Sequence, residues 1–138
     1  VVISRNTSDW PRKYWRLAMT KKRKKGDCYK SAADTMVDMV MFQHIDPNAL
    51  RLVHGRPTIT VPPYCRYGHA WIEINGLIVI DTEAGACVPR AVYHSVGKIN
   101  QEECFYYTFE EMKETLLNFG HYGPWQGPEA VEPLPFPR

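Results

Sequence analysis

A thiol, an imidazole and a carboxylate follow one another along the chain in an order that suits nucleophilic catalysis. Cys28 lies in GDCYKSAADTM, His69 opens HAWIEI, and Asp81 follows the apolar run LIVI. A histidine within reach of a cysteine can take the thiol proton, so that the thiolate attacks an acyl carbon, and can later return the proton to the leaving group. A carboxylate on the other side of the imidazole fixes its tautomer and stabilises its cation. Cys28, His69 and Asp81 are therefore our candidate catalytic residues.

Cys28 is predicted at the start of a helix. Residues 28–42 carry an apolar stripe at helical spacing, and Asp27 is a favourable residue just before the first turn. The unpaired N–H groups and the dipole of a helix N-terminus stabilise a thiolate and can also face a developing oxyanion. A basic block, KKRKK at residues 21–25, adds positive charge upstream. Such a block is typical of a solvated loop or helix end, or alternatively of a localisation or polyanion-binding element.

His69 and Asp81 fall at the two ends of a predicted β-hairpin, HAWIEI-NG-LIVIDT. Side chains alternate between the two faces of a strand, so the turn decides whether these two residues meet. A two-residue Asn-Gly turn, the commoner interpretation of this dipeptide, pairs His69 with Thr82 and turns Asp81 to the opposite face. A three-residue loop of residues 74–76 pairs His69 with Asp81 instead, and a bulge elsewhere in the hairpin is the other solution. We expect the bulged register, because it alone joins the imidazole to the carboxylate.

Two short motifs carry a resemblance to a known family. They are G-x-C-x-x-x-A, residues 26–32, and G-H-A-W-I-E-I-N-G-x-x-x-I-D-T, residues 68–82. Together they resemble the transglutaminase-like branch of the papain-like cysteine enzymes. The resemblance implies a catalytic cysteine at a helix start, a histidine on a strand and an aspartate at the end of the next strand. Members include peptidases, amidases, transamidases and some inactive binding domains, so the resemblance implies a type of chemistry rather than a substrate.

The chain also departs from that family's pattern. No proline follows Asp81, and Lys22 stands where papain-type enzymes carry a glutamine. The oxyanion tryptophan of the transglutaminase type would have to be Trp10 or Trp15.

The predicted elements follow the order of an α+β protein, in which a helix carrying Cys28 packs on a small antiparallel sheet carrying His69 and Asp81. We expect a further helix near residues 8–19, strands at 50–55, 57–62 and 104–108, and a loop between the hairpin and the last of these strands. Thr108 and Glu111 form a predicted capping box, and Gly120 closes the helix that follows. One papain-like or transglutaminase-like domain should span residues 1–122, and residues 123–138 should form a proline-rich tail outside the core.

The composition is that of an ordinary globular protein, 44% hydrophobic and 23% charged, with a net charge of +2. This charge is too small to indicate a nucleic-acid partner, and no apolar run approaches the ~20 residues of a membrane span. The N-terminal sequence has no long apolar segment typical of a secretion signal, so we expect a cytoplasmic protein with four reduced cysteines. The cysteines and histidines have poor zinc-binding spacings, and we expect neither a metal nor a cofactor.

The sequence therefore favours a cysteine-dependent hydrolase, a thiol protease or amidase, that cleaves an amide or isopeptide bond in a peptide or small amide. A transamidase or acyltransferase would share the acyl-enzyme and differ only in the acceptor. A non-catalytic binding domain on the same scaffold is the third alternative. Three residues are candidates for substrate binding: Tyr67 beside the approach to His69, His54 at the end of a predicted strand, and Trp15 through the family resemblance.

Overall fold

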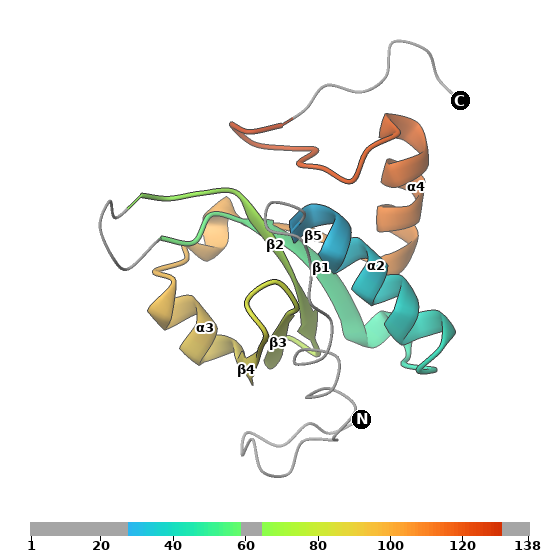
Figure 1. The fold of residues 1–138 in the computed structure, drawn as a ribbon, viewed down its shortest axis with the longest axis horizontal. Coiled ribbons are helices and arrows are strands. Elements are labelled where there is room, and N and C mark those ends of the chain that lie inside the picture. The colour runs from blue at the N-terminus through green and yellow to red at the C-terminus, as the bar shows by residue number, and fades with distance from the viewer. Residues whose placement is uncertain (1–27, 59–64, 131–138) are drawn as a thin grey trace.

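The computed structural model describes residues 28–58 and 65–130, which form a five-stranded antiparallel sheet with helices on both faces (Figure 1). The helices are α2 (Cys28–Met41), α3 (Arg90–Val96) and α4 (Phe109–Phe119), and short 3-10 turns span Pro47–Ala49 and Gln101–Glu103. The strands are β1 (Leu50–Gly55), β2 (His69–Ile74), β3 (Ile78–Asp81), β4 (Ala86–Pro89) and β5 (Phe105–Tyr107), in the spatial order β4-β3-β2-β1-β5. The α+β class predicted from the order of elements is confirmed.

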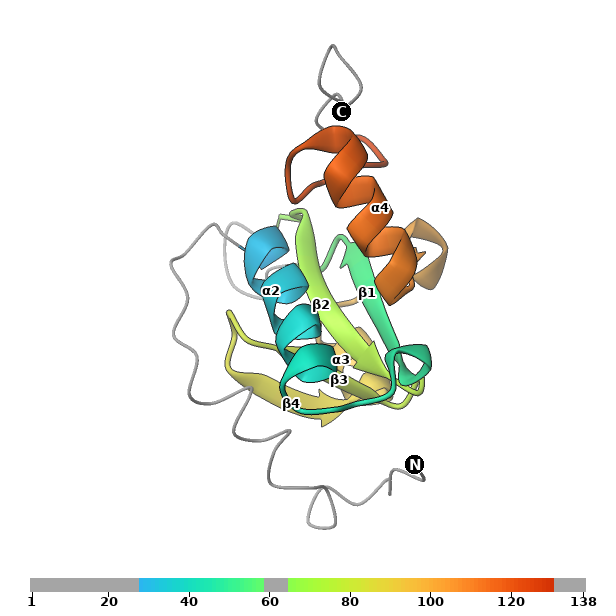
Figure 2. The ribbon, with the colours of Figure 1, turned by 90° about the vertical axis from the view of Figure 1, so that its right-hand side faces the viewer.

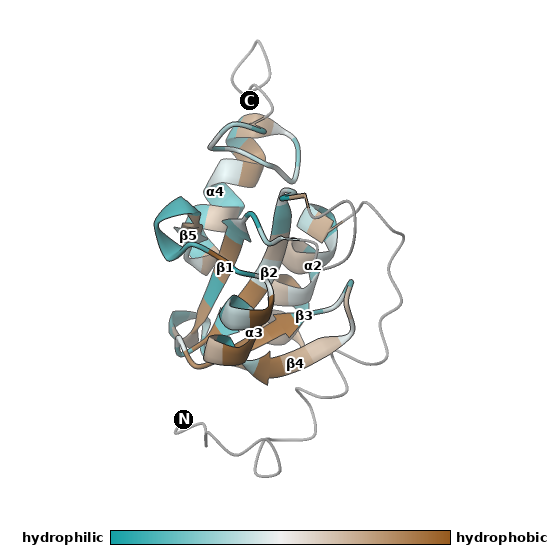
Figure 3. Ribbon diagram, turned by 90° about the vertical axis from the view of Figure 1, so that its left-hand side faces the viewer, coloured by the Kyte–Doolittle hydropathy of each residue, from teal (hydrophilic) through white to brown (hydrophobic). Residues whose placement is uncertain are grey.

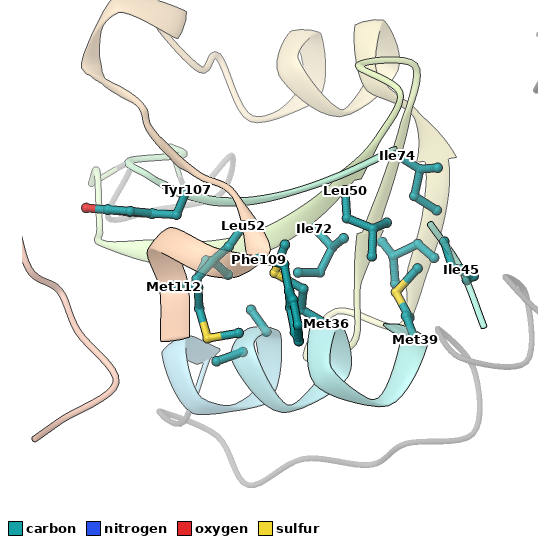
Figure 4. Close-up of a cluster of buried hydrophobic side chains, with 14 of the residues drawn as sticks. Met36, Met39, Ile45, Leu50, Leu52, Ile72, Ile74, Tyr107, Phe109 and Met112 are labelled. Carbon is teal, nitrogen blue, oxygen red and sulfur yellow. The ribbon is translucent and has the colours of Figure 1, made fainter. Parts of the chain in front are cut away.

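The main core lies between the sheet and the pair α2 and α4, which cover the same face (Figures 2 and 4). Alternate residues of β1, β2 and β3 point to this side, as the period of two along a strand requires. Met36 and Met39 of α2 meet them and are fully buried. Each such side chain stabilises the fold by about 1.5–3 kcal/mol through burial. The strand residues of this cluster are Leu50, Leu52, Ala70, Ile72, Ile74, Ile78, Ile80, Cys87 and Tyr107.

A smaller core lies on the other face, beneath α3 (Figure 3). Val53, Trp71 and Val79 are fully buried there, and Tyr93 of α3 packs against them. The remaining residues of β2 thus point to the α3 side, which makes β2 a strand buried on both faces. His69 and Asp81 belong to this second set by the same alternation.

The hairpin between β2 and β3 places His69 and Asp81 on the same face of the sheet, as the chemistry required, but its loop differs from the one we expected. Asn75 and Gly76 both have positive φ, 53° and 64°, and the Leu77 N–H donates to the Ile74 carbonyl at 3.0 Å, as in the two-residue turn that Asn-Gly favours. Pairing then resumes at Ile74 with Ile78, so Leu77 is an extra residue that forms a bulge.

The expected loop of residues 74–76 is therefore wrong by one position, and the three-residue loop is 75–77. His69 is not directly opposite Asp81. Continuing the register past the Ile72–Ile80 pair places Asp81 opposite Trp71, on the same face as His69 and diagonal to it. Diagonal neighbours on a sheet remain within reach of longer side chains.

The helices of the described residues confirm two local predictions. Helix α2 begins at Cys28 and ends at Met41. Helix α4 begins at the expected capping box, with Thr108 and Glu111 each bonding the other's backbone, and ends at Gly120 in the left-handed region with φ 71°. Asp27, the helix expected near residues 8–19 and the basic block at 21–25 lie outside the described residues, as does most of the strand expected at 57–62.

Two other expectations were wrong. The segment after the hairpin, which we expected to be a loop, contains β4 and α3. Pro89 is compatible with a strand here because it lies at the end of an edge strand, where a missing N–H is tolerated. The tail was expected to begin at residue 123, yet Trp125 is only 5% exposed and belongs to the main core. Trp125 thus anchors this segment on the domain, and residues 131–138 lie outside the described part. Within the described ranges, no helix is long and apolar enough to cross a membrane.

Candidate active site

A buried imidazole–carboxylate pair forms the centre of the candidate site. His69 Nε2 lies 2.7 Å from Asp81 Oδ2, and the two side chains are only 4% and 3% exposed. His69 opens β2 and Asp81 ends β3, so the hairpin alone positions both groups. Because Asp81 is a carboxylate acceptor, Nε2 carries the proton of this bond and Nδ1 is left to face the rest of the site.

Asp81 is held in its ionised form by two further donors. The Tyr93 hydroxyl donates to Oδ2 at 2.6 Å, and the Ala84 N–H donates to Oδ1 at 3.1 Å. Burial acts to raise the pKa of Asp81, but the hydrogen bonds from His69, Tyr93 and Ala84 outweigh it and lower that pKa. Burial and the negative charge of Asp81 raise the pKa of Tyr93, which therefore stays a proton donor.

The thiol of Cys28 reaches this pair from the first residue of α2. Cys28 Sγ, a ring nitrogen of His69 and a carboxylate oxygen of Glu83 all lie within 4.8 Å of one another. Burial alone would lower the pKa of His69, but hydrogen bonds to Asp81 and to Cys28, together with their charges, raise it to about 10. The site therefore favours a protonated imidazole at His69. Cys28 and Asp81 thus both lie beside His69, as we predicted from the sequence.

Glu83 is an acidic residue at the site that the sequence did not suggest. It follows β3 closely, and its Oε2 atom is buried with no hydrogen-bond partner among the residues described. Sulfur, nitrogen and oxygen ligands at this spacing suit a zinc-type ion, and His69 would keep its bond to Asp81 as metal-bound histidines usually do. No other group of three such residues occurs in the described ranges. We predicted no metal, and the spacing of these residues along the sequence does not indicate a metal site.

The three candidate substrate-binding residues lie in different places relative to the site. Tyr67 is 38% exposed and its ring centre lies 5.5 Å from that of His69, so it stands beside the imidazole. His54 is on the other face of the sheet, paired with Ala70 and in contact with Tyr29 of α2, and it does not touch the three catalytic candidates. Trp15, like Trp10 and Lys22, lies outside the described residues.

The other cysteines differ from Cys28 in their surroundings. All four are free, and none of the other three lies within 4.8 Å of both a histidine nitrogen and a carboxylate oxygen among the described residues. Burial raises the pKa of Cys87 to about 12 and is the main cause that raises the pKa of Cys104 to about 11. Cys65 is exposed. Only Cys28 therefore combines a helix start with a neighbouring imidazole.

Tyr93 is the second site residue that sequence reasoning missed. It lies on α3, a seven-residue helix with no buried residue, so no apolar period marks this segment in the sequence. Its position depends on the pairing of β4 with β3, which brings α3 back over the hairpin. A tyrosine a short distance after Asp81 carries no local signal of this contact.

Comparisons with protein-family models, with curated proteins and with solved structures find no significant match to this chain.

Proposed function

We propose that this chain is a cysteine-dependent hydrolase that cleaves an amide or isopeptide bond through an acyl-enzyme. The observation that carries the proposal is the arrangement of Cys28 at a helix start, within 4.8 Å of a ring nitrogen of buried His69, whose Nε2 lies 2.7 Å from Asp81. This arrangement is the nucleophile–base–orienter pattern in its cysteine form. We further propose that the architecture is a papain-like or transglutaminase-like core and that the protein acts in the cytoplasm.

The first half of the reaction starts, in this proposal, from a Cys28 thiolate and a protonated His69. The Cys28 thiolate attacks the carbonyl carbon of the substrate, and the backbone N–H groups of the first turn of α2 face the oxygen that becomes negative. The C–N bond then breaks, and the leaving nitrogen takes the proton from Nδ1 of His69. An amine leaves, and the acyl group remains on sulfur as a thioester.

In the second half, His69 acts as a base. It takes a proton from water, the hydroxide oxygen attacks the thioester, and the C–S bond breaks to release a carboxylic acid and the Cys28 thiolate. Asp81 keeps Nε2 protonated throughout, so that Nδ1 alone exchanges the proton. Tyr93 acts through Asp81 and is a positioning residue.

A transamidase of the transglutaminase type is the second candidate. The observation that favours it is the Glu83 carboxylate, whose Oε2 atom has no partner among the described residues and which lies near the thiol. A carboxylate at this point would attract the ammonium group of an incoming amine, which would then replace water as the acceptor. Incorporation of a fluorescent primary amine into a protein substrate distinguishes transfer from hydrolysis.

Selective alkylation tests the nucleophile without knowledge of the substrate. Iodoacetamide at pH 6 should modify Cys28 at least about tenfold faster than Cys65, because an ordinary thiol is almost fully protonated at that pH. The His69→Gln variant should remove most of this advantage, whereas the rate at Cys65 should not change. Site-resolved mass spectrometry measures both rates in one sample. Faster modification of Cys65 than of Cys28 in the native protein would end the proposal.

Turnover is the second test, with a library of quenched fluorescent peptides as substrates. Cys28→Ala and His69→Ala should keep the fold by circular dichroism and lose activity. Asp81→Asn should keep a reduced residual rate, because the carboxylate orients the imidazole and does not react. Wild-type turnover in Cys28→Ala would refute the assignment of the nucleophile, and a folded, inactive native protein would favour a binding domain.

A further inference from the structure

A pocket of about 280 Å³ lies on the α2 side of the sheet, beside the candidate site. Its walls come from the start of α2, the end of β1, the residue before β2, the start of β5 and the segment 124–129 that follows α4. The volume is at the lower limit for small-molecule sites and suits a single amino-acid side chain.

Two of the lining residues connect the pocket to the catalytic candidates. Tyr29 directly follows Cys28, and Gly68 directly precedes His69. A Cβ atom on Gly68 would collide with the Tyr29 hydroxyl and with the Glu129 carboxylate, so the glycine allows the two walls to approach each other. A substrate whose carbonyl carbon lies at Sγ therefore has its neighbouring groups within reach of this pocket.

His54 is a buried polar residue of the pocket whose ring nitrogens have no hydrogen-bond partner among the described residues. It is only 3% exposed. The ring is held by Tyr29, Tyr107 and Trp125, whose ring centres lie 4.8, 5.1 and 4.9 Å away. Burial lowers the pKa of His54 to about 3, so the ring is neutral and presents one donor and one acceptor. A buried polar group without a partner is costly, and a ligand that bonds it recovers that cost.

The charges around the pocket compensate one another. Glu129 faces Arg56, with Oε1 and Nε 3.6 Å apart, and Glu103 forms an ion pair with Arg66. The other walls are flat and apolar, made by Phe105 and the prolines of residues 124–128. Paired charges favour a neutral ligand, and flat walls favour a ring.

We propose that this pocket is the specificity subsite for the acyl part of the substrate, and that it takes an aromatic side chain with a polar tip, a phenol or an indole, which forms a hydrogen bond with His54. The inference rests on the proposed function, because it places the substrate relative to Cys28. It assigns His54 the binding role predicted from the sequence, but in a pocket next to the catalytic groups rather than among them.

Peptidyl vinyl sulfones that differ only in the side chain next to the reactive group test the proposal. Each probe alkylates Cys28, and mass spectrometry gives the second-order rate constant. A tyrosine probe should react at least about tenfold faster than an alanine probe and several-fold faster than a phenylalanine probe. Lysine and glutamate probes should be no faster than the alanine probe. A charged side chain reacting fastest, or no dependence on the side chain, would overturn the proposal.

His54→Phe is the matched variant, since it keeps an aromatic ring and removes both nitrogens. It should abolish the preference for tyrosine over phenylalanine. Persistence of that preference in His54→Phe would refute the role of His54. Phe105→Ala is the second variant if His54→Phe does not fold. It removes one flat wall and should reduce the preference for both aromatic probes, and an unchanged preference would count against the pocket.

A binding experiment separates this inference from the proposed function. In Cys28→Ala protein, N-acetyl-tyrosinamide should shift the ring NMR signals of His54 in a saturable way, whereas N-acetyl-alaninamide should not. Saturable binding with an unreactive Cys28 in the native protein would sink the enzyme proposal and keep the pocket. A reactive Cys28 without any tyrosine-dependent shift at His54 would sink the pocket and keep the enzyme.

Discussion

The hydroxyl of Tyr93 is the contact whose removal gives the sharpest test of the site. In the Tyr93→Phe variant the ring still packs on Trp71, whose ring centre is 5.2 Å away, and only the bond to Asp81 is lost. That bond is 2.6 Å long and ends on a carboxylate held by His69 and by the Ala84 N–H. The change therefore removes one of three donors without creating a large cavity.

The expected loss follows from the type of bond. A hydrogen bond to a charged partner contributes about 1.5–3 kcal/mol to stability. Because two donors to Asp81 remain, we expect the lower part of this range, about 1.5–2 kcal/mol at pH 7. At about 1.4 kcal/mol for each pKa unit, the pKa of Asp81 should rise by about one unit.

Urea unfolding of the native protein and of Tyr93→Phe at several pH values is the assay. The pKa of Asp81 is lowered in the folded protein, so its contribution is present above the pKa of the unfolded chain, ~3.9, and is lost as the pH falls through the folded value. The free energy of unfolding should differ between the two proteins by about 1.5–2 kcal/mol from pH 5 to 7. The difference should shrink below pH 4.

Tyr106→Phe is the matched control, because the Tyr106 hydroxyl accepts a hydrogen bond from half-buried Arg90 and not from the groups around Asp81. It should change the free energy of unfolding by less than about 0.5 kcal/mol at every pH. If Tyr93→Phe behaved like this control, or if its effect did not depend on pH, the phenol would not be supporting an ionised Asp81.

Three further results are expected. The raised pKa of His69, about 10, contributes stability that is complete below its unfolded value of ~6.5 and is lost as the pH rises through 10. In urea unfolding, His69→Gln should therefore be less stable than the native protein at pH 6, and the difference should be smaller at pH 10.5. Zinc ions should slow the alkylation of Cys28, and Glu83→Gln should weaken this protection about tenfold without changing the metal-free rate; equal protection in both proteins would exclude Glu83 as a ligand. Gly55→Ala should lower the free energy of unfolding by about 2 kcal/mol in urea, because its Cβ would lie 2.5 Å from the Trp71 ring, and a neutral effect would contradict that packing.

The parts of the fold that could be predicted from the sequence are those with local signals. Helix α2 has an apolar stripe, α4 has a capping box and a closing glycine, and the strands of the hairpin are long apolar runs. The placement of His69 and Asp81 on the same face was also predictable. Only a three-residue loop or a bulge brings together two ionisable side chains at the ends of these buried strands. The sequence favoured the Asn-Gly turn as well, and Leu77 reconciles the two by forming the bulge.

The remainder could not be predicted because it depends on tertiary contacts. Strand β4 is short and ends at a proline, and α3 has no buried face, so neither has a periodic pattern. Tyr93 reaches Asp81 only after these two elements have folded back on β3. Trp125 lies in a proline-rich segment that is typical of a tail, yet its indole fills a place in the main core.

The division of the site between α2 and a distant hairpin makes the reactivity of Cys28 a property of the finished fold. A nascent or denatured chain holds the thiol far from His69 in space, so it carries four ordinary cysteines and no activated nucleophile. Such a chain is no more able to attack its neighbours than any other newly made protein. The rate at which Cys28 is alkylated at mildly acidic pH therefore reports on folding, because it rises only when α2 has docked on β2.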